Sequence, residues 1–162
     1  MKMKNLDPLK EAETVRRISW SEKYSVGIKL IDAQHMELVN LTNELYKSLY
    51  AANVEEKCKK FEEAIHSLVK YVRHHFSAEL ELLKKIQFPD IQNHKIQHEQ
   101  LIKNILEAQK TFSQGKHLVL NKFARTLEEW IFGHIGIYDQ AYALFIKNQK
   151  KNNLLTDSDL IL

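Results

Sequence analysis

Hydrophobic side chains recur along most of the chain at alternating intervals of three and four residues. This interval is typical of α-helices that bury one face and expose the other. Four helical segments are expected, and they cover residues 32–52, 55–86, 90–113 and 117–147. The breaks between them fall at Asn53, at Gln87-Phe88-Pro89 and at Gln114-Gly115-Lys116.

The ends of two helices carry recognisable signals. Asp32 is expected to cap the N-terminus of the first helix, and Pro89 suits the first turn of the third. Glycine and proline are scarce in the chain, which favours long helices with short connections. Short connections make neighbouring helices antiparallel, so the sequence predicts an all-α fold, an up-down-up-down antiparallel four-helix bundle.

Residues 18–147 form the expected bundle, with a non-helical N-terminal lead-in that contains Trp20 and Gly27. Residues 1–17 are polar and contain Pro8, and we expect an N-terminal tail there. Residues 148–162 form a second expected tail at the C-terminus. Its LLTDSDLIL segment has enough apolar residues to pack back on the bundle.

Polar residues interrupt the apolar face of every predicted helix. Those that the spacing places on a buried face are His35, His75, Glu79, His94, His98 and His134. In an alternating bundle, the starts of odd-numbered helices and the ends of even-numbered helices share one end of the molecule. All of these side chains are therefore expected at one level of one core.

So many buried imidazoles beside a carboxylate need strong partners. Burying a polar group without a partner costs roughly 2–7 kcal/mol, and a whole domain is stable by only about 5–15 kcal/mol. Metal ions resolve this conflict because they use the lone pairs and the negative charge. Calcium and magnesium prefer oxygen ligands, and structural zinc prefers thiolates. The mixed imidazole and carboxylate set favours iron over copper, zinc, nickel and manganese, and two ions fit the number of ligands.

Four segments of the chain resemble the hemerythrin family, and most closely its single-domain bacterial members. They are WSEKYSVGIKLIDAQH at 20–35, HFSAE at 75–79, HKIQH at 94–98 and WIFGHIGIYD at 130–139. They stand in the order found in the family and span roughly residues 18–147. Four matched segments with fitting separations are far more specific than any one of them.

The resemblance implies a centre of two non-heme iron ions (Fe2+/Fe3+) joined by a bridging oxo or hydroxo group. The ligands that it implies are His35, His75, Glu79, His94, His98, His134 and Asp139. Glu79 and Asp139 would be bridging carboxylates. In the family both irons are octahedral, and this ligand set leaves one position open on one iron. Dioxygen would bind there, which implies reversible oxygen binding for storage or delivery and no enzymatic activity.

Asp139 is the one implied ligand that the hydrophobic period does not find. Five residues after His134 corresponds to about 140° around an ideal helix. Asp139 must therefore reach in from the side or lie on a locally distorted turn. His74 is adjacent to His75, but only His75 is four residues from Glu79 and on the buried face.

The other histidines and the expected pocket complete the picture of the site. His66 and His117 fall off the buried faces and are expected to bind no metal. A dry pocket would slow irreversible oxidation of the iron, and its candidate lining is Leu38, Phe76, Leu101, Trp130 and Ile131.

Two other functions stay open: a di-iron redox enzyme that handles peroxide or nitric oxide or repairs iron–sulfur clusters, and an oxygen sensor.

Composition narrows the setting. The net charge of +3 is spread along the chain without a strong basic block, so no nucleic acid is expected as a partner. No apolar run reaches the roughly 18 residues that cross a bilayer, and the first residues do not form a signal peptide. Cys58 is the single cysteine, so no internal disulfide is possible. We therefore expect a cytoplasmic protein that does not bind membranes.

Overall fold

The fold is all-α, as the sequence predicts. The computed structural model describes residues 16–114 and 119–161, and no strand occurs among them. The elements in chain order are η1 Glu22–Tyr24, α1 Lys29–Ser48, α2 Val54–Lys85, α3 Ile91–Ser113, α4 Val119–His134, η2 Ile135–Asp139, α5 Gln140–Lys151 and η3 Asp157–Leu160. The short elements η1 and η3 are 3-10 helices, and η2 is a π-helix.

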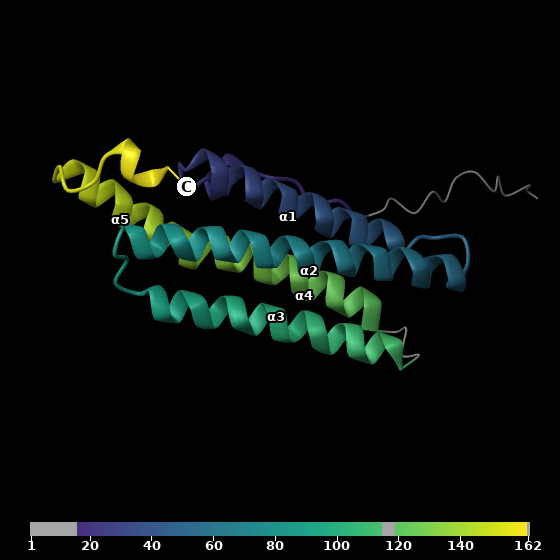
Figure 1. Ribbon diagram of the computed structural model, residues 1–162. Coiled ribbons are helices and arrows are strands. Elements are labelled where there is room, and N and C mark those ends of the chain that lie inside the picture. The colour runs from purple at the N-terminus through teal and green to yellow at the C-terminus, as the bar shows by residue number, and fades with distance from the viewer. Residues whose placement is uncertain (1–15, 115–118, 162) are drawn as a thin grey trace, which may run out of the picture.

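The long helices run alternately up and down, which confirms the predicted bundle (Figure 1). α1 packs against α2 and α4, and α3 packs against the same two helices. The fourth helix of the bundle is continuous through α4, η2 and α5, and α5 extends beyond the other helices at one end (Figure 1). At the end of the molecule where α5 lies, α1 and α3 therefore start, and α2 and α4 end.

Local sequence accounts for both ends of α2. Asn53 caps its start, because the Glu56 backbone N–H donates to the Asn53 side-chain oxygen at 2.8 Å. At its end Gln87 adopts a left-handed conformation with φ of 54°, and the Phe88 N–H donates to the Leu83 carbonyl at 2.9 Å. This is a Schellman-type stop. The predicted breaks at Asn53 and at Gln87-Phe88 are confirmed, and most of the third break lies outside the described residues.

Two predicted helix signals are wrong. Asp32 does not cap α1, which starts at Lys29. Its carboxylate instead reaches back to accept hydrogen bonds from the Ser25 hydroxyl at 2.7 Å and the Val26 N–H at 2.8 Å. These bonds fix the bend before the helix, where Gly27 takes a φ of 75°. Pro89 lies before α3, whose N-cap is Asp90, because the stop that ends α2 extends the connection.

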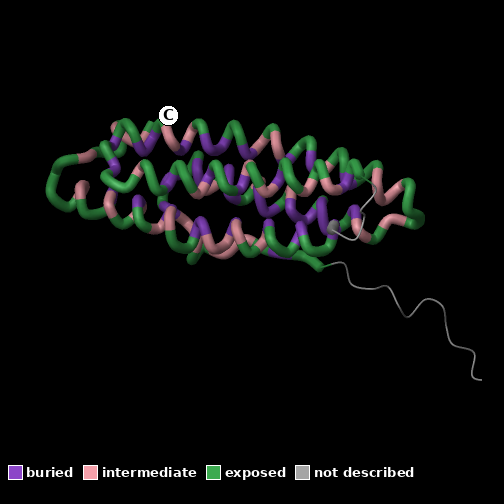
Figure 2. Tube along the Cα trace, turned by 90° about the horizontal axis from the view of Figure 1, so that it is seen from below, coloured by how far each residue is buried: buried purple, intermediate pink, exposed green. Residues whose placement is uncertain are grey.

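Each long helix turns its buried residues toward the inside of the bundle (Figure 2). These residues form two apolar clusters. The larger cluster fills the middle of the bundle and the end away from α5. The smaller cluster joins the lead-in, the last turns of α2 and the start of α5 around Tyr142. Along α1, His35 lies between Ile31 of the smaller cluster and Leu38 of the larger one. Glu79 has the same position on α2, so a polar layer separates the two clusters.

The C-terminal segment packs back on the smaller cluster, as its apolar residues allowed. The helix expected to end near residue 147 continues to Lys151, and the chain then reverses at Asn153 with φ of 57°. Leu155 and Leu160 contact the smaller cluster. Residues 1–15, within the expected N-terminal tail, lie outside the described residues.

Candidate metal centre

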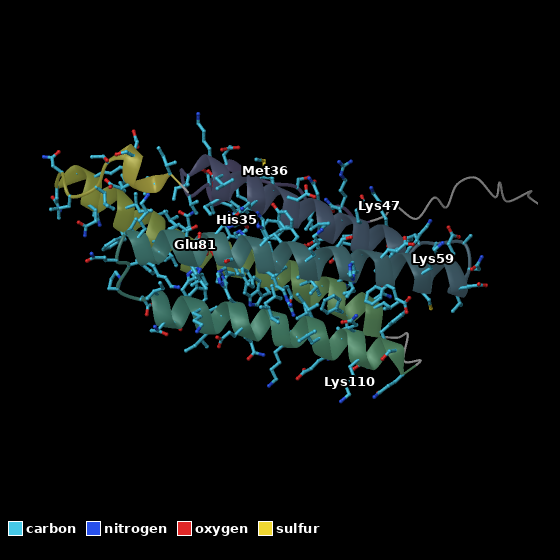
Figure 3. All side chains as sticks on the ribbon, viewed as in Figure 1. His35, Met36, Lys47, Lys59, Glu81 and Lys110 are labelled. Atoms are coloured by element: carbon cyan, nitrogen blue, oxygen red, sulfur yellow. The ribbon has the colours of Figure 1, made fainter. Side chains whose placement is uncertain are left out.

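The structure brings all seven candidate ligands together in the polar layer between the two apolar clusters. The residues, with their exposed fractions, are His35 (0%), His75 (1%), Glu79 (0%), His94 (1%), His98 (2%), His134 (3%) and Asp139 (0%). His35 lies near the end of α1 close to α5, and Glu81 marks the same end of α2 (Figure 3). Lys47, Lys59 and Lys110 lie toward the opposite end (Figure 3). The predicted convergence at one end is confirmed.

Three histidines and Glu79 form the first group of possible ligands. The atoms of Glu79, His94, His98 and His134 that could bind a metal lie within 4.8 Å of one another. The Nε2 atoms of His94 and His98 lie 3.1 and 3.0 Å from Glu79 Oε2. His98 Nε2 and His134 Nε2 are 3.1 Å apart. We call this set the three-histidine group.

The second group contains His35, His75 and the same glutamate. His35 Nε2 lies 4.0 Å from Glu79 Oε1, and His75 Nε2 lies 3.9 Å from Glu79 Oε2. We call this set the two-histidine group. Because Glu79 belongs to both groups, its carboxylate lies where it could join two ions.

Asp139 makes a second link between the groups. Its Oδ2 lies 3.2 Å from His35 Nε2, and its Oδ1 lies 3.1 Å from His134 Nε2 and 3.6 Å from His94 Nε2. The π-helix Ile135–Asp139 makes this possible, since its wider turn returns Asp139 to the face of His134. The expected distorted turn is confirmed.

The same π-helix changes which residues are buried after His134. In a regular α-helix the three-four spacing would place Tyr138 and Ala141 on the buried face after His134, but Tyr138 is half-buried and Ala141 is exposed. Tyr142 and Ile146 are buried in their place. The extra residue in the π-helix shifts the register by one position. That shift brings Tyr142 under the site.

Many polar atoms of the site have no hydrogen-bond partner among the described residues. They are both ring nitrogens of His35, the Nδ1 atoms of His94, His98 and His134, and both carboxylate oxygens of Asp139. Buried polar atoms are almost always paired. Of these, His35 Nε2 and the two Asp139 oxygens lie among the other candidate ligand atoms and are suitable donors for iron. The residues present therefore fit the metal centre that the ligand pattern implies.

Four of the candidate ligands have protonation states that suit the binding of cations. Burial lowers the pKa of His75 and of His98 to about 4, which keeps both imidazoles neutral and their lone pairs free. Burial alone would raise the pKa of Glu79, but contacts with His94 and His98 hold it well below its usual range. Asp139 is likewise held below its usual pKa by His134 despite its burial. Two buried carboxylates are thus anionic.

Two further side chains support the site, and sequence periodicity missed both. Gln34 is buried, and its Oε1 lies 3.0 Å from His75 Nδ1. Accepting a hydrogen bond there selects the tautomer whose Nε2 lone pair points at the centre. The Tyr142 hydroxyl donates to Glu79 Oε1 at 2.7 Å. A polar residue directly before a ligand was the only signal for Gln34, and Tyr142 was hidden by the register shift.

The remaining histidines do not reach the centre. His74 and His66 are exposed, so His75 is the member of its pair that the structure brings to the site. His117 lies outside the described residues. None of the helices in the described part of the chain is long and apolar enough to span a membrane.

Comparison with known proteins agrees with this geometry. Residues 26–143 match the family model of the hemerythrin HHE cation binding domain. A bacteriohemerythrin of Stenotrophomonas maltophilia is 31% identical over 128 residues, 79% of this chain and 80% of its own length. A bacteriohemerythrin of Clostridium acetobutylicum is 29% identical and is covered over 96% of its length by 76% of this chain. The crystal structure of a wild-type hemerythrin shares the fold, with a TM-score of 0.70 and 24% identity over 78% of this chain and 95% of that one.

Proposed function

The chain belongs to the hemerythrin family of cation-binding domains, and from that premise we propose that it binds dioxygen reversibly at a centre of two non-heme iron ions. The observation that carries the proposal is the inequality of the two histidine groups. One group offers three imidazoles and the other offers two, while Glu79 and Asp139 reach both. Between two ions of equal coordination number, the second ion is one protein ligand short.

In this proposal each residue has a defined role. His94, His98 and His134 would hold one iron, His35 and His75 would hold the other, and Glu79 and Asp139 would contribute to both. The ion of the two-histidine group would have one fewer imidazole and so would leave room for dioxygen. When bound, the two ferrous ions supply the electrons that dioxygen takes up on binding.

The protein around the centre orients the ligands and excludes water. Gln34 fixes the ring of His75, and the Tyr142 hydroxyl holds one oxygen of Glu79. Apolar side chains cover the centre on both sides along the helices. Leu38, Phe76, Leu101 and Ile131 are nearly inaccessible, at 4% exposure or less, and Trp130 is half-buried. Phe76 stacks on His98 with ring centroids 3.6 Å apart. This dry environment supports a carrier of oxygen rather than an enzyme that consumes it.

The decisive experiment follows the visible spectrum of the iron-loaded protein through an oxygen cycle. The anaerobically reduced protein should gain a charge-transfer band when oxygen is admitted and lose the band when oxygen is removed. Two iron ions per chain should accompany this behaviour. A single conversion to a ferric form that never returns would contradict reversible binding and would favour the alternative of a redox enzyme.

Two adjacent histidines provide a matched pair of variants. His75→Ala should reduce the iron content and abolish the reversible band, because His75 is buried against Glu79. His74→Ala changes the same residue type one position away, on the exposed side of α2. It should keep the iron content and the spectrum of the unaltered protein. An equal loss of iron and of the reversible band in both variants would contradict the assignment of His75 as a ligand.

A further inference from the structure

Both tryptophans of the chain lie against a histidine of the candidate centre, one in each histidine group. The Trp130 ring is stacked on His134, with centroids 4.4 Å apart and planes 12° apart. The Trp20 ring lies 6.0 Å from the His35 ring at an angle of 33°. Both indoles are half-buried, so each reaches from the polar layer toward the surface. The chain has only these two tryptophans.

We propose that Trp130 is the port through which electrons enter the metal centre from a low-potential one-electron carrier. This inference rests on the proposed function, which requires both irons to be ferrous. An iron that has been oxidised stays inactive until it is reduced. The apolar clusters that keep water out also keep charged reductants away from the metals. A route through the protein is therefore needed.

The aromatic contacts give that route. Electron tunnelling slows steeply as the gap between donor and acceptor widens, and stacked conjugated rings shorten the gap. From Trp130 the path leads directly to His134. It also leads through Phe76, whose centroid is 5.9 Å away, to His98, on which Phe76 stacks with planes 3° apart. One half-buried indole thus connects to two members of the three-histidine group.

The two indoles differ in how closely they contact the candidate ligands. The Trp130 ring stacks on His134 and also contacts Phe76, whereas the Trp20 ring lies farther from His35 and packs against Tyr24 at 6.1 Å between centroids. At Gly133, one turn after Trp130, an added Cβ would meet open space. The surface there therefore leaves room for a carrier that presents the edge of a redox-active ring.

The electron count is simple. Each carrier molecule gives one electron and leaves oxidised, and two such molecules return two ferric ions to the ferrous state. No bond of the indole forms or breaks.

The test measures how fast the methyl viologen radical reduces the ferric, iron-loaded protein. Trp130→Leu should lower the second-order rate constant by more than about twofold, because leucine removes the conjugated ring that stacks on His134. Trp130→Phe keeps an aromatic ring, so its rate constant should lie between those of Trp130→Leu and the unaltered protein. Trp20→Leu is the matched control and should remain within about twofold of the unaltered protein. Iron content, helicity and midpoint potential should be equal in all four proteins, so that the rate reports the route alone.

A second readout uses fluorescence instead of turnover. Trp20→Phe leaves Trp130 as the single tryptophan, and Trp130→Phe leaves Trp20. Ferric iron should quench Trp130 more strongly than Trp20, and redox-inert zinc should quench neither. Quenching in the opposite order would overturn the proposal.

The two proposals fail in different ways. If the unaltered protein takes up no iron or shows no reversible oxygen band, the proposed function is wrong and the port falls with it. If the oxygen cycle is reversible but the rate constant for reduction of Trp130→Leu stays within about twofold of the normal value, only the electron port is wrong. Equal slowing in Trp20→Leu would also overturn it, because the effect would then not belong to Trp130.

Discussion

Removal of one hydroxyl group tests how the polar layer is held together. Tyr142 is completely buried, and its hydroxyl donates to Glu79 Oε1 at 2.7 Å. Burial raises the pKa of Tyr142 well above its usual value, so the hydroxyl stays protonated and remains a donor. Glu79 is also completely buried and has no route to water that could replace this bond. Tyr142→Phe therefore leaves one oxygen of a buried carboxylate without its donor.

The expected cost follows from the charge on the acceptor. A hydrogen bond to a charged group contributes about 1.5–3 kcal/mol to folding, and an unsatisfied buried partner adds to the loss. Tyr142→Phe should lower the free energy of unfolding by at least this amount in chelator-treated protein. In a chain of this size, that corresponds to a melting temperature lower by roughly 3–12 °C. In the iron-loaded protein the loss should be smaller, because the cation also neutralises Glu79.

Urea unfolding followed by circular dichroism measures this difference. Tyr138→Phe is the control, since Tyr138 lies in the same stretch of helix and is only half-buried. It should change the free energy of unfolding by no more than about 0.5 kcal/mol, as is usual away from buried networks. A change below about 0.5 kcal/mol in Tyr142→Phe, or an equal loss in both variants, would refute the argument.

Three further predictions probe other parts of the molecule. Gln34→Leu removes the acceptor for His75 Nδ1 and should weaken metal affinity by about 10–100-fold in a chelator competition, while Gln34→Glu should retain binding. Arg16 donates to Glu128 at 2.8 Å and holds the pKa of that carboxyl below its usual value. The stability that Glu128 gains should be complete above its unfolded pKa of about 4.3 and lost as the pH falls through the lower folded pKa, so the advantage over Glu128→Gln should vanish in acid unfolding curves. Phe61→Ala, in the cluster far from the site, should cost about 3–5 kcal/mol by urea unfolding, yet leave the spectrum of the folded iron protein unchanged.

Periodicity predicted the fold well because the bundle is built from regular helices. The apolar residues that the three-four spacing places on the inner face of α2 and its C-cap are all buried, namely Phe61, Ile65, Leu68, Val72, Leu82 and Ile86. The errors lie where side chains bond across a helix end. Asp32 has the chemistry of a capping residue, but it accepts bonds from Ser25 and Val26 instead. No spacing rule distinguishes these two uses of an aspartate, because they differ only in the direction in which the chain approaches.

The site shows the same limit in a sharper form. Counting by threes and fours located the histidines and Glu79, because each occupies a core position of an ordinary α-helix. Asp139 was implied by resemblance alone, since its interval of five from His134 belongs to a π-helix. Once that interval is known, the burial of Tyr142 follows, and Ala141 no longer belongs on the inner face. The π-helix is thus the reason why the hydrophobic pattern finds the histidines and Glu79 but misses Asp139 and Tyr142.

The position of the polar layer connects stability to function. Apolar clusters lie on both sides of it, and the burial of each cluster stabilises its part of the bundle. The layer between them contains anionic Glu79 and Asp139 and five imidazoles, several with unpaired nitrogens. Such a layer weakens the fold until cations neutralise it, so binding energy for metal becomes folding energy. The same clusters also keep the centre dry, and the proposed reversible oxygen binding would require that dryness.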